Sequence, residues 1–217
     1  MKKILLIGDS IRNQYYAYVK KALEDVAEVY THEDSARFTT HTLRSLYNWV
    51  QNGNLPEDMD VVHWNVSLWD IMRLYGDDTP LTPLDTYALN IKRIDKALRI
   101  FFPKAKFIFA TCTAVREELF KEWWYTRRNA DAKTYSQEAV KVLSSTDTVV
   151  NDLFEHTKDL DVSYYCDNTH FSEDKGVPYI ARKVLDVICE VANIDKSKIK
   201  NADGTAVRKQ EASVFGV

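Results

Sequence analysis

The sequence predicts an α/β fold built around a parallel sheet. Short apolar stretches alternate along the chain with longer amphipathic stretches, which is the pattern of repeated strand–helix–strand units. The first stretch, Lys3–Ile7, is almost wholly apolar, as expected of a strand that is buried on both faces of a parallel sheet. Because such units cross over in a right-handed sense, helices are expected to cover both faces of that sheet.

Two helices and one further strand are predicted in the next part of the chain. Apolar residues at helical spacing predict a helix over Gln14–Val26 and a second helix over Thr40–Val50. Between them, the β-forming residues of Glu28–Thr31 predict a strand. The second helix is expected to end before Asn52-Gly53-Asn54, which is a turn-forming sequence.

The middle of the chain repeats this alternation. Asp60–Trp64 contains two adjacent valines and predicts the third strand. Residues 76–83 have the composition of a loop. A long amphipathic pattern then predicts a helix over Asp85–Phe102, which Pro103 ends, and Lys106–Ala110 predicts the fourth strand.

The last third of the chain is expected to complete a single domain over residues 1–194. Its predicted elements are helices over Ala132–Leu143 and Thr148–Thr157, a fifth strand over Val162–Cys166 and a closing helix over Ser172–Asn193. Pro178 is expected to mark either the true start of that helix or a kink. Residues 195–217 are polar and weakly patterned, and are expected to be a C-terminal extension or a disordered tail.

Composition narrows the class of function. The net charge of −3 gives no basic surface for nucleic acid, and no apolar run is long enough to span a membrane. The three cysteines form no CxxC pair and fit reduced thiols, which predicts a cytoplasmic protein. The histidines lack metal-ligand spacing and no glycine-rich phosphate motif is present, so no metal or cofactor is expected. The oligomeric state is not predicted.

Three groups of reactive side chains follow predicted strands. Ser10 follows the first strand, Asn65 the third, and Asp167 and His170 the fifth. In an open parallel sheet, functional groups collect beyond the carboxyl ends of the strands, so we expect these residues to lie together.

Each group supports a catalytic and a purely structural interpretation. A serine hydroxyl needs an adjacent base, which His170 can supply, while Asp167 can fix the tautomer of that histidine. The amide of Asn65 can donate to an oxyanion. Alternatively, Ser10 and His170 only cap helices, Asp167 only begins a turn, and Asn65 only satisfies loop backbone groups.

Together these residues resemble the SGNH hydrolases, also called GDSL-like lipases and acylhydrolases. Gly8-Asp9-Ser10 is similar to the nucleophile motif of the family and Asp167-Asn168-Thr169-His170 to its DxxH motif, while Asn65 matches the asparagine of its third motif. The resemblance spans residues 3–193. It implies a flavodoxin-like three-layer α/β/α sandwich with a central five-stranded parallel sheet. It also implies a serine esterase that works through an acyl-serine intermediate.

The sequence departs from the family pattern at two motifs. His63 stands where the third motif usually has glycine, and Val66 follows Asn65 in place of aspartate. In the second motif, Arg37 takes the position of the glycine that supplies an oxyanion N–H. The resemblance therefore implies an oxyanion hole formed by the backbone N–H groups of Ser10 and Arg37 and the Asn65 amide.

Four residues are candidates for binding the substrate: Asp9, Trp64, Trp69 and Trp123. Aromatic side chains stack on sugar rings, so an acylated sugar, and O-acetyl esters in particular, is the expected small-molecule substrate. Trp124 has the helical spacing of a core residue, and Cys166 is expected to be a buried thiol of the fifth strand. The alternatives are a lysophospholipase or thioesterase, or a non-catalytic protein that binds glycans or a partner.

Overall fold

A parallel sheet of five strands forms the centre of the computed structural model, which describes residues 1–199. Across the sheet the strands are β2 (Ala27–Thr31), β1 (Lys2–Ile7), β3 (Val61–Asn65), β5 (Lys106–Ala110) and β7 (Val149–Asn151). All four pairings are parallel. This order is that of the flavodoxin-like doubly wound folds, so the predicted fold class is confirmed.

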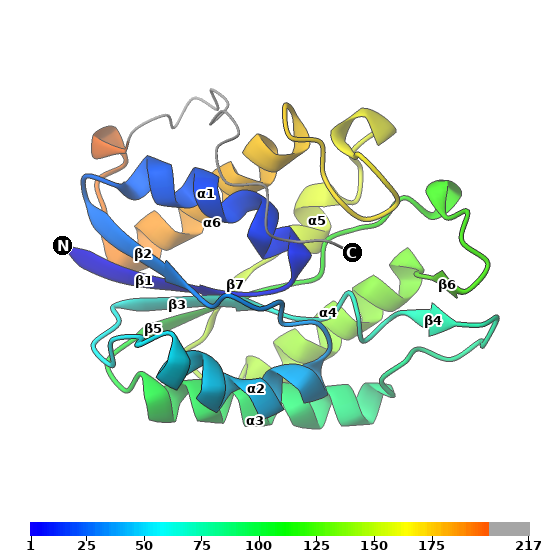
Figure 1. Ribbon diagram of the computed structural model, residues 1–217, viewed down its shortest axis with the longest axis horizontal. Coiled ribbons are helices and arrows are strands. Elements are labelled where there is room, and N and C mark those ends of the chain that lie inside the picture. The colour runs from blue at the N-terminus through cyan, green and yellow to red at the C-terminus, as the bar shows by residue number, and fades with distance from the viewer. Residues whose placement is uncertain (200–217) are drawn as a thin grey trace.

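Helices cover both faces of the sheet, which makes three layers (Figure 1). On one face, α1 (Ser10–Leu23) packs against α6 (Gly176–Ala192), and the short α5 (Leu153–Thr157) lies beside α6. On the other face, α3 (Leu84–Phe101) packs between α2 (Thr39–Asn52) and α4 (Asn129–Leu143). The apolar residues at helical spacing therefore face the sheet, as expected of amphipathic helices.

The register of the sheet aligns the carboxyl ends of the strands. Ile7 at the end of β1 pairs with Trp64, and Asn65 at the end of β3 pairs with Ala110. The apolar residues of β1 are almost completely buried, as the unbroken apolar run predicted. The loops that follow β1, β3 and β5 consequently leave the sheet along one edge.

The prediction of the fifth strand at Val162–Cys166 is wrong. That segment contains a 3-10 turn, η2 (Val162–Tyr164), and then a single antiparallel bridge. The fifth strand is β7, inside the segment predicted as a helix over Thr148–Thr157. Two adjacent valines favour this strand. Asp152 makes the helix α5 begin only after the strand, because its side chain accepts a hydrogen bond from Glu155 N in the first turn.

Two very short strands were not predicted. β4 (Arg73–Leu74) pairs with β6 (Tyr125–Thr126) in an antiparallel arrangement beyond the carboxyl ends of the central strands (Figure 1). Two residues per strand leave no periodic pattern for the sequence to show, although the strands are 51 positions apart along the chain. A 3-10 turn, η1 (Glu117–Leu119), lies in the segment that leads to β6.

The C-terminal helix begins later than predicted. α6 starts at Gly176, and Pro178 lies in its first turn, where the missing N–H costs no hydrogen bond. The expected extension over residues 195–217 begins with a 3-10 turn, η3 (Lys196–Lys198), and its remainder from residue 200 lies outside the described residues.

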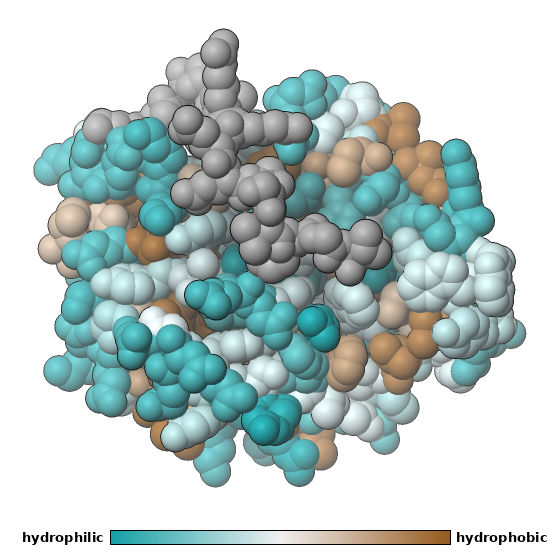
Figure 2. Space-filling model, in the orientation of Figure 1, coloured by the Kyte–Doolittle hydropathy of each residue, from teal (hydrophilic) through white to brown (hydrophobic). Residues whose placement is uncertain are grey.

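Within the described part of the chain, no helix has the length and apolar character to cross a membrane. The face in Figure 2 is predominantly hydrophilic, with hydrophobic residues in small groups.

A buried carboxylate from the loop after β3 fixes the start of α2. Asp70 is fully buried and accepts hydrogen bonds from Thr39 N, at 3.0 and 3.1 Å, and from Thr39 Oγ1 at 2.7 Å. Phe38, the residue before the helix, has no side chain that could serve as a cap. The loops after β2 and β3 are therefore joined through the positive end of a helix.

The stability of the protein should depend on the ionisation of Asp70. Burial raises the pKa of Asp70 from 3.8 to about 6, so the native state holds this proton more tightly than the unfolded chain does. The stabilisation from the protonated form is complete below pH 3.8 and is lost as the pH rises through 6, a loss of about 3 kcal/mol. Asp70→Asn should therefore gain stability relative to the parent between pH 4 and 7, measured as the difference in Tm.

Asp78→Asn is the matched control, because the side chain of Asp78 is 92% exposed. Its Tm difference from the parent should stay constant over the same pH range. A constant difference for Asp70→Asn would contradict the assigned role of this carboxyl group.

Candidate active site

Ser10, His170 and Asp167 form a continuous line of hydrogen bonds. Ser10 Oγ lies 2.7 Å from His170 Nε2, and His170 Nδ1 lies 2.7 Å from Asp167 Oδ2. The carboxylate accepts only, so the proton of the neutral ring is on Nδ1 and the lone pair of Nε2 faces the serine hydroxyl. The arrangement allows His170 to take a proton from Ser10.

Hydrogen bonds keep the carboxyl group of Asp167 ionised. Partial burial alone would raise its pKa, but hydrogen bonds from the His170 ring and from the backbone N–H groups of His170 and Thr169 hold the pKa well below its usual range. The backbone bonds to Asp167 Oδ1 are 2.6 Å from His170 N and 2.7 Å from Thr169 N. Asp167 thus shapes the turn that presents His170 and also orients its ring.

The loop that carries Asp167 and His170 is closed like a small hairpin. Tyr165 and Phe171 form the antiparallel bridge, and Cys166 N donates to His170 O at 2.9 Å. The sequence prediction placed Cys166 in a strand as a buried thiol, and this is wrong: Cys166 is exposed in the turn. The apolar residues of this segment predicted a strand. In the structure they pack around a turn instead of extending along the sheet.

Gln14 joins this loop to the helix that carries the serine. Gln14 Nε2 donates to Phe171 O at 2.9 Å, and Phe171 N donates to Gln14 Oε1 at 3.1 Å. Gln14 is four residues after Ser10 in α1, so the two side chains lie on one face of the helix. Gln14 was not predicted as a residue of the site, although a polar side chain one turn after the serine was a usable signal.

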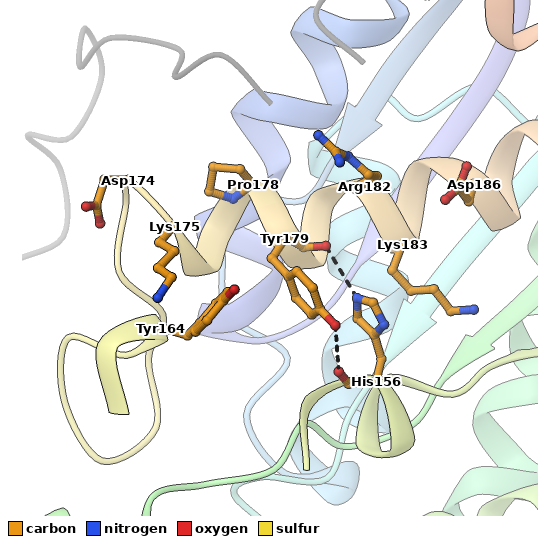
Figure 3. A pocket seen from close by; sticks show the side chains of 9 residues that line it. All are labelled: His156, Tyr164, Asp174, Lys175, Pro178, Tyr179, Arg182, Lys183 and Asp186. Atoms are coloured by element: carbon orange, nitrogen blue, oxygen red, sulfur yellow. Dashed lines mark hydrogen bonds between the residues drawn. The ribbon is translucent and has the colours of Figure 1, made fainter. Parts of the chain in front are cut away.

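The base of the loop borders a separate surface pocket. This pocket, of about 320 Å³, lies between α6, α5 and η2 (Figure 3). On its wall Lys175 Nζ lies 4.1 Å from the centre of the Tyr164 ring, and Tyr179 stacks on His156 with ring centres 4.2 Å apart. None of the candidate catalytic residues lines this pocket, so it is distinct from the site around Ser10.

Asp9 and Asn65 form the side of the site next to the sheet. Asp9 Oδ1 accepts a hydrogen bond from Ile11 N at 3.0 Å, which caps α1, and another from Asn65 Nδ2 at 3.3 Å. Burial raises the pKa of Asp9, whose side chain is only 1% exposed. Asp9 was predicted to bind substrate, but its carboxyl group is turned inward to the helix start and to Asn65. Its position indicates support for Ser10 and Asn65 instead.

Arg37 has a left-handed backbone conformation. Its φ is +52°, in the left-handed region that favours glycine. The preceding residue, Ala36, donates its N–H to Gly8 O at 2.9 Å, which places this turn next to the turn of Ser10. The Arg37 side chain extends to Asp34, 3.4 Å away, and is about half exposed. Arg37 therefore has a conformation that glycine adopts more readily, at the position where the second motif has glycine.

The aromatic candidates occupy different environments. Trp64 was predicted to bind substrate, but it is completely buried and contacts Phe109 edge to face. Trp69 is partly exposed, and Trp123 is 82% exposed beside the ring of Tyr75. Trp124 was expected in the core, yet it is 41% exposed, and its segment is a bend that leads into β6 and not a helix.

His63, in the glycine position of the third motif, points into the core. It is fully buried, and its Nε2 lies 3.2 Å from Asn151 Nδ2 of β7. Burial lowers the pKa of His63 to about 4, so the ring is neutral near pH 7. Among residues 1–199, no group of histidine, cysteine, aspartate and glutamate side chains is arranged to hold a metal ion.

Solved esterases and lipases share this fold. A lipase/acylhydrolase from Enterococcus faecalis matches with a TM-score of 0.68 at 18% identity, over 92% of this chain and 98% of that chain. An acetyl xylan esterase matches with a TM-score of 0.66 at 18% identity, over 86% and 99%. A carbohydrate esterase of family 3 from Talaromyces cellulolyticus matches with a TM-score of 0.62 at 14% identity, over 89% and 99%.

The sequence itself is more distant from known proteins than the fold is. No protein-family model matches the chain, and a search of curated proteins gives no match either. At identities below 20%, the structural likeness establishes the fold, which is that of the GDSL-like lipases and acylhydrolases. The fold expected from the sequence motifs is thereby confirmed.

The left-handed conformation of Arg37 predicts an unusual stabilising substitution. Arg37→Gly should raise the free energy of unfolding by roughly 0.5–1 kcal/mol, because glycine adopts this conformation without the steric cost that a side chain meets. Arg37→Ala is the matched control, since it removes the same side chain and the same exposed ion pair but keeps that cost. Urea denaturation of both variants measures the difference, and equal stabilities would contradict the prediction.

Proposed function

We propose that this chain, which has the fold of the SGNH hydrolases, is a carboxylic-ester hydrolase with Ser10 as its nucleophile. The observation that carries the proposal is the line of two 2.7 Å contacts from Ser10 through His170 to Asp167. A hydroxyl, an imidazole and a carboxylate in this order activate a serine for attack on an acyl group. The likeness to solved esterases and lipases supports the same reaction class.

In the first half of the reaction, Ser10 Oγ attacks the ester carbonyl while His170 Nε2 takes the hydroxyl proton. The tetrahedral intermediate collapses, and His170 returns the proton to the leaving alcohol. Water then attacks the acyl-serine with His170 again as base, which releases the acid and frees Ser10. Asp167 stays ionised throughout and stabilises the positively charged ring.

Three donors form the proposed oxyanion hole. Ser10 is the first residue of α1, so its N–H has no acceptor within the helix and lies at the positive end of the helix dipole. Asn65 uses one N–H of its amide for Asp9, and the second is left for the oxyanion. The N–H of Arg37, in the turn whose Ala36 N–H donates to Gly8 O, completes the set.

The substrate we propose is a short acyl ester, and an O-acetyl group on a sugar in particular. Trp69 and Trp123 are the aromatic candidates that retain exposed surface, and Tyr75 adds a ring that is 72% exposed beside Trp123. Such rings stack on sugars and on other flat apolar surfaces. Two of the solved structures are described as an acetyl xylan esterase and a carbohydrate esterase.

The three free cysteines support a cytoplasmic location.

Ser10→Ala tests the reaction class. The variant should hydrolyse p-nitrophenyl acetate at least about 10³-fold more slowly than the parent, because no other group takes over nucleophilic attack. Release of p-nitrophenol at pH 7.5 measures the rate, and circular dichroism checks that the variant is folded. Equal rates in both proteins would rule out the esterase and leave the alternative of a non-catalytic protein that binds glycans or a partner.

The acyl chain is tested with a series of p-nitrophenyl esters. The value of kcat/KM should be highest for acetate and at least about tenfold lower for decanoate. A deacetylase needs no apolar channel for a long acyl chain, so a longer chain adds no favourable contact. Release of acetate from acetylated oligosaccharides should follow the same dependence on Ser10. A maximum at decanoate would favour the lysophospholipase or thioesterase alternative.

A further inference from the structure

Arg127 is a buried arginine that contacts two loops of the proposed site. Arg127 is the residue after β6, and it is only 6% exposed. Nε donates to Leu68 O at 2.5 Å, Nη1 donates to Thr169 Oγ1 at 3.1 Å, and Nη2 lies 3.7 Å from Met72 Sδ. One guanidinium group therefore links the loop after β3 to the loop that carries the candidate base.

These two loops hold different parts of the proposed chemistry. Leu68 comes three residues after Asn65, a proposed oxyanion donor. Thr169 lies between Asp167 and His170, the proposed orienting carboxylate and base. The planar fork of Arg127 sets the spacing between the loops, because its N–H groups point in fixed directions.

The surroundings of Thr169 belong to the same network. Thr169 Oγ1 donates to Asn168 Oδ1 at 2.7 Å, and Asn168 Nδ2 lies 3.3 Å from Tyr125 Oη. The ring of Tyr125 lies 5.4 Å from the guanidinium carbon of Arg127. The segment at β6 thus holds the loop of His170 both through Arg127 and through Asn168.

Arg127 also carries a charge that no adjacent carboxylate neutralises. None of the ion pairs within residues 1–199 includes Arg127, although Asp9 and Asp167 are near enough to interact with it electrostatically. Burial lowers its pKa, while Tyr125, Cys112 and the two aspartates oppose that change. A buried cation without an ion-pair partner is unfavourable for stability, and the hydrogen bonds of Arg127 to the two loops offset part of this cost.

We propose that Arg127 is a positioning residue that fixes the distance between the oxyanion donor Asn65 and the base His170. The inference rests on the proposed esterase function and adds to it a residue outside the motifs of that function. Arg127 acts through Leu68 and Thr169 and does not itself touch the substrate. Its loss should therefore lower kcat while KM stays nearly unchanged, because the ground-state contacts remain.

Arg127→Lys is the first test. Lysine keeps the charge, but all its N–H donors are on one nitrogen. That nitrogen cannot occupy the separate positions of Nε and Nη1, which donate to Leu68 O and Thr169 Oγ1. With p-nitrophenyl acetate, kcat should fall by about 30-fold or more and KM should change by less than about threefold, as expected when reacting groups are misplaced. Tm is measured in parallel.

Arg73→Lys is the matched control. Arg73 is a buried arginine of the same two-stranded sheet, 7% exposed, but its guanidinium pairs with Asp131 at 2.9 and 3.0 Å and not with the loops of the site. It should lose a similar amount of Tm and keep kcat within about twofold of the parent, because its hydrogen bonds go to α4 and not to the loops of Asn65 and His170. An equal fall in kcat for both variants would reduce Arg127 to a structural role and overturn the proposal.

Two further measurements do not depend on the stability of that lysine variant. Guanidinium ion at about 20 mM should restore kcat of Arg127→Ala at least several-fold, by filling the space with the same fork, whereas ammonium ion should not. Thr169→Val removes the acceptor and leaves Arg127 in place, and it should lower kcat without a change in KM. The proposal would be overturned if guanidinium ion did not rescue Arg127→Ala and Thr169→Val kept the kcat of the parent.

Ser10→Ala in the same assay separates the inference from the function on which it rests. If Ser10→Ala is inactive and Arg127→Lys and Thr169→Val keep the parent kcat, the positioning role alone is refuted. If Ser10→Ala keeps the parent rate, the esterase function is refuted and the positioning role with it.

Discussion

Gly8 lies where the turn after β1 meets the end of β3 and the loop after β2. A Cβ atom there would overlap Asn65 Oδ1 and would lie 2.6 Å from Arg12 Cβ. Because Gly8 has no side chain, the amide of Asn65 can lie directly over the turn that presents Ser10. The proposed nucleophile and the proposed oxyanion donor Asn65 can lie next to each other because this space is empty.

A buried polar network holds the same turn from the other side. Gly8 N and Arg12 Nη2 both donate to His32 Nε2, at 3.3 and 3.1 Å, which places the ring proton on Nδ1. Burial, together with the charge of Arg12, lowers the pKa of His32 to about 2 and keeps the ring neutral. Arg12 Nη2 also donates to Asp34 O at 2.7 Å, so the loop leading to Arg37 is tied to the helix of Ser10.

The sequence was informative where a local pattern determines the structure. The parallel sheet followed from apolar runs and their alternation with helices, and the resemblance to known motifs gathered Ser10, Asn65 and His170 at one edge. The assignment of Trp64 to the substrate failed because Trp64 lies inside β3, and helices cover both faces of the sheet at this strand. Standing next to Asn65 in the sequence therefore does not bring its ring to the surface.

Other features could not be predicted because their cause is not local. The two valines of β7 favour a strand, but with three residues it is too short for a pattern to show, and its pairing with β5 decides its conformation. The left-handed turn at Arg37 is imposed by the contacts of its loop, and no propensity of arginine indicates it. Asp70 and Arg127 were missed because each acts on a segment at least 31 positions away in the sequence.

The proposed base differs from the nucleophile in how the fold supports it. Ser10 is fixed by β1, α1 and the contacts of Gly8, whereas the loop of His170 follows no strand of the central sheet. Gln14 holds this loop through both backbone groups of Phe171, and it does so from the helix that begins with Ser10. Arg127 joins the same loop to the loop after β3, on the side of Asn65. The proposed base is therefore held from two directions, by Gln14 toward the proposed nucleophile and by Arg127 toward the proposed oxyanion donor. Of the two distances that the proposed reaction needs, the one for proton transfer thus depends on the contacts of Gln14, and the one between the base and the oxyanion donor depends on the contacts of Arg127.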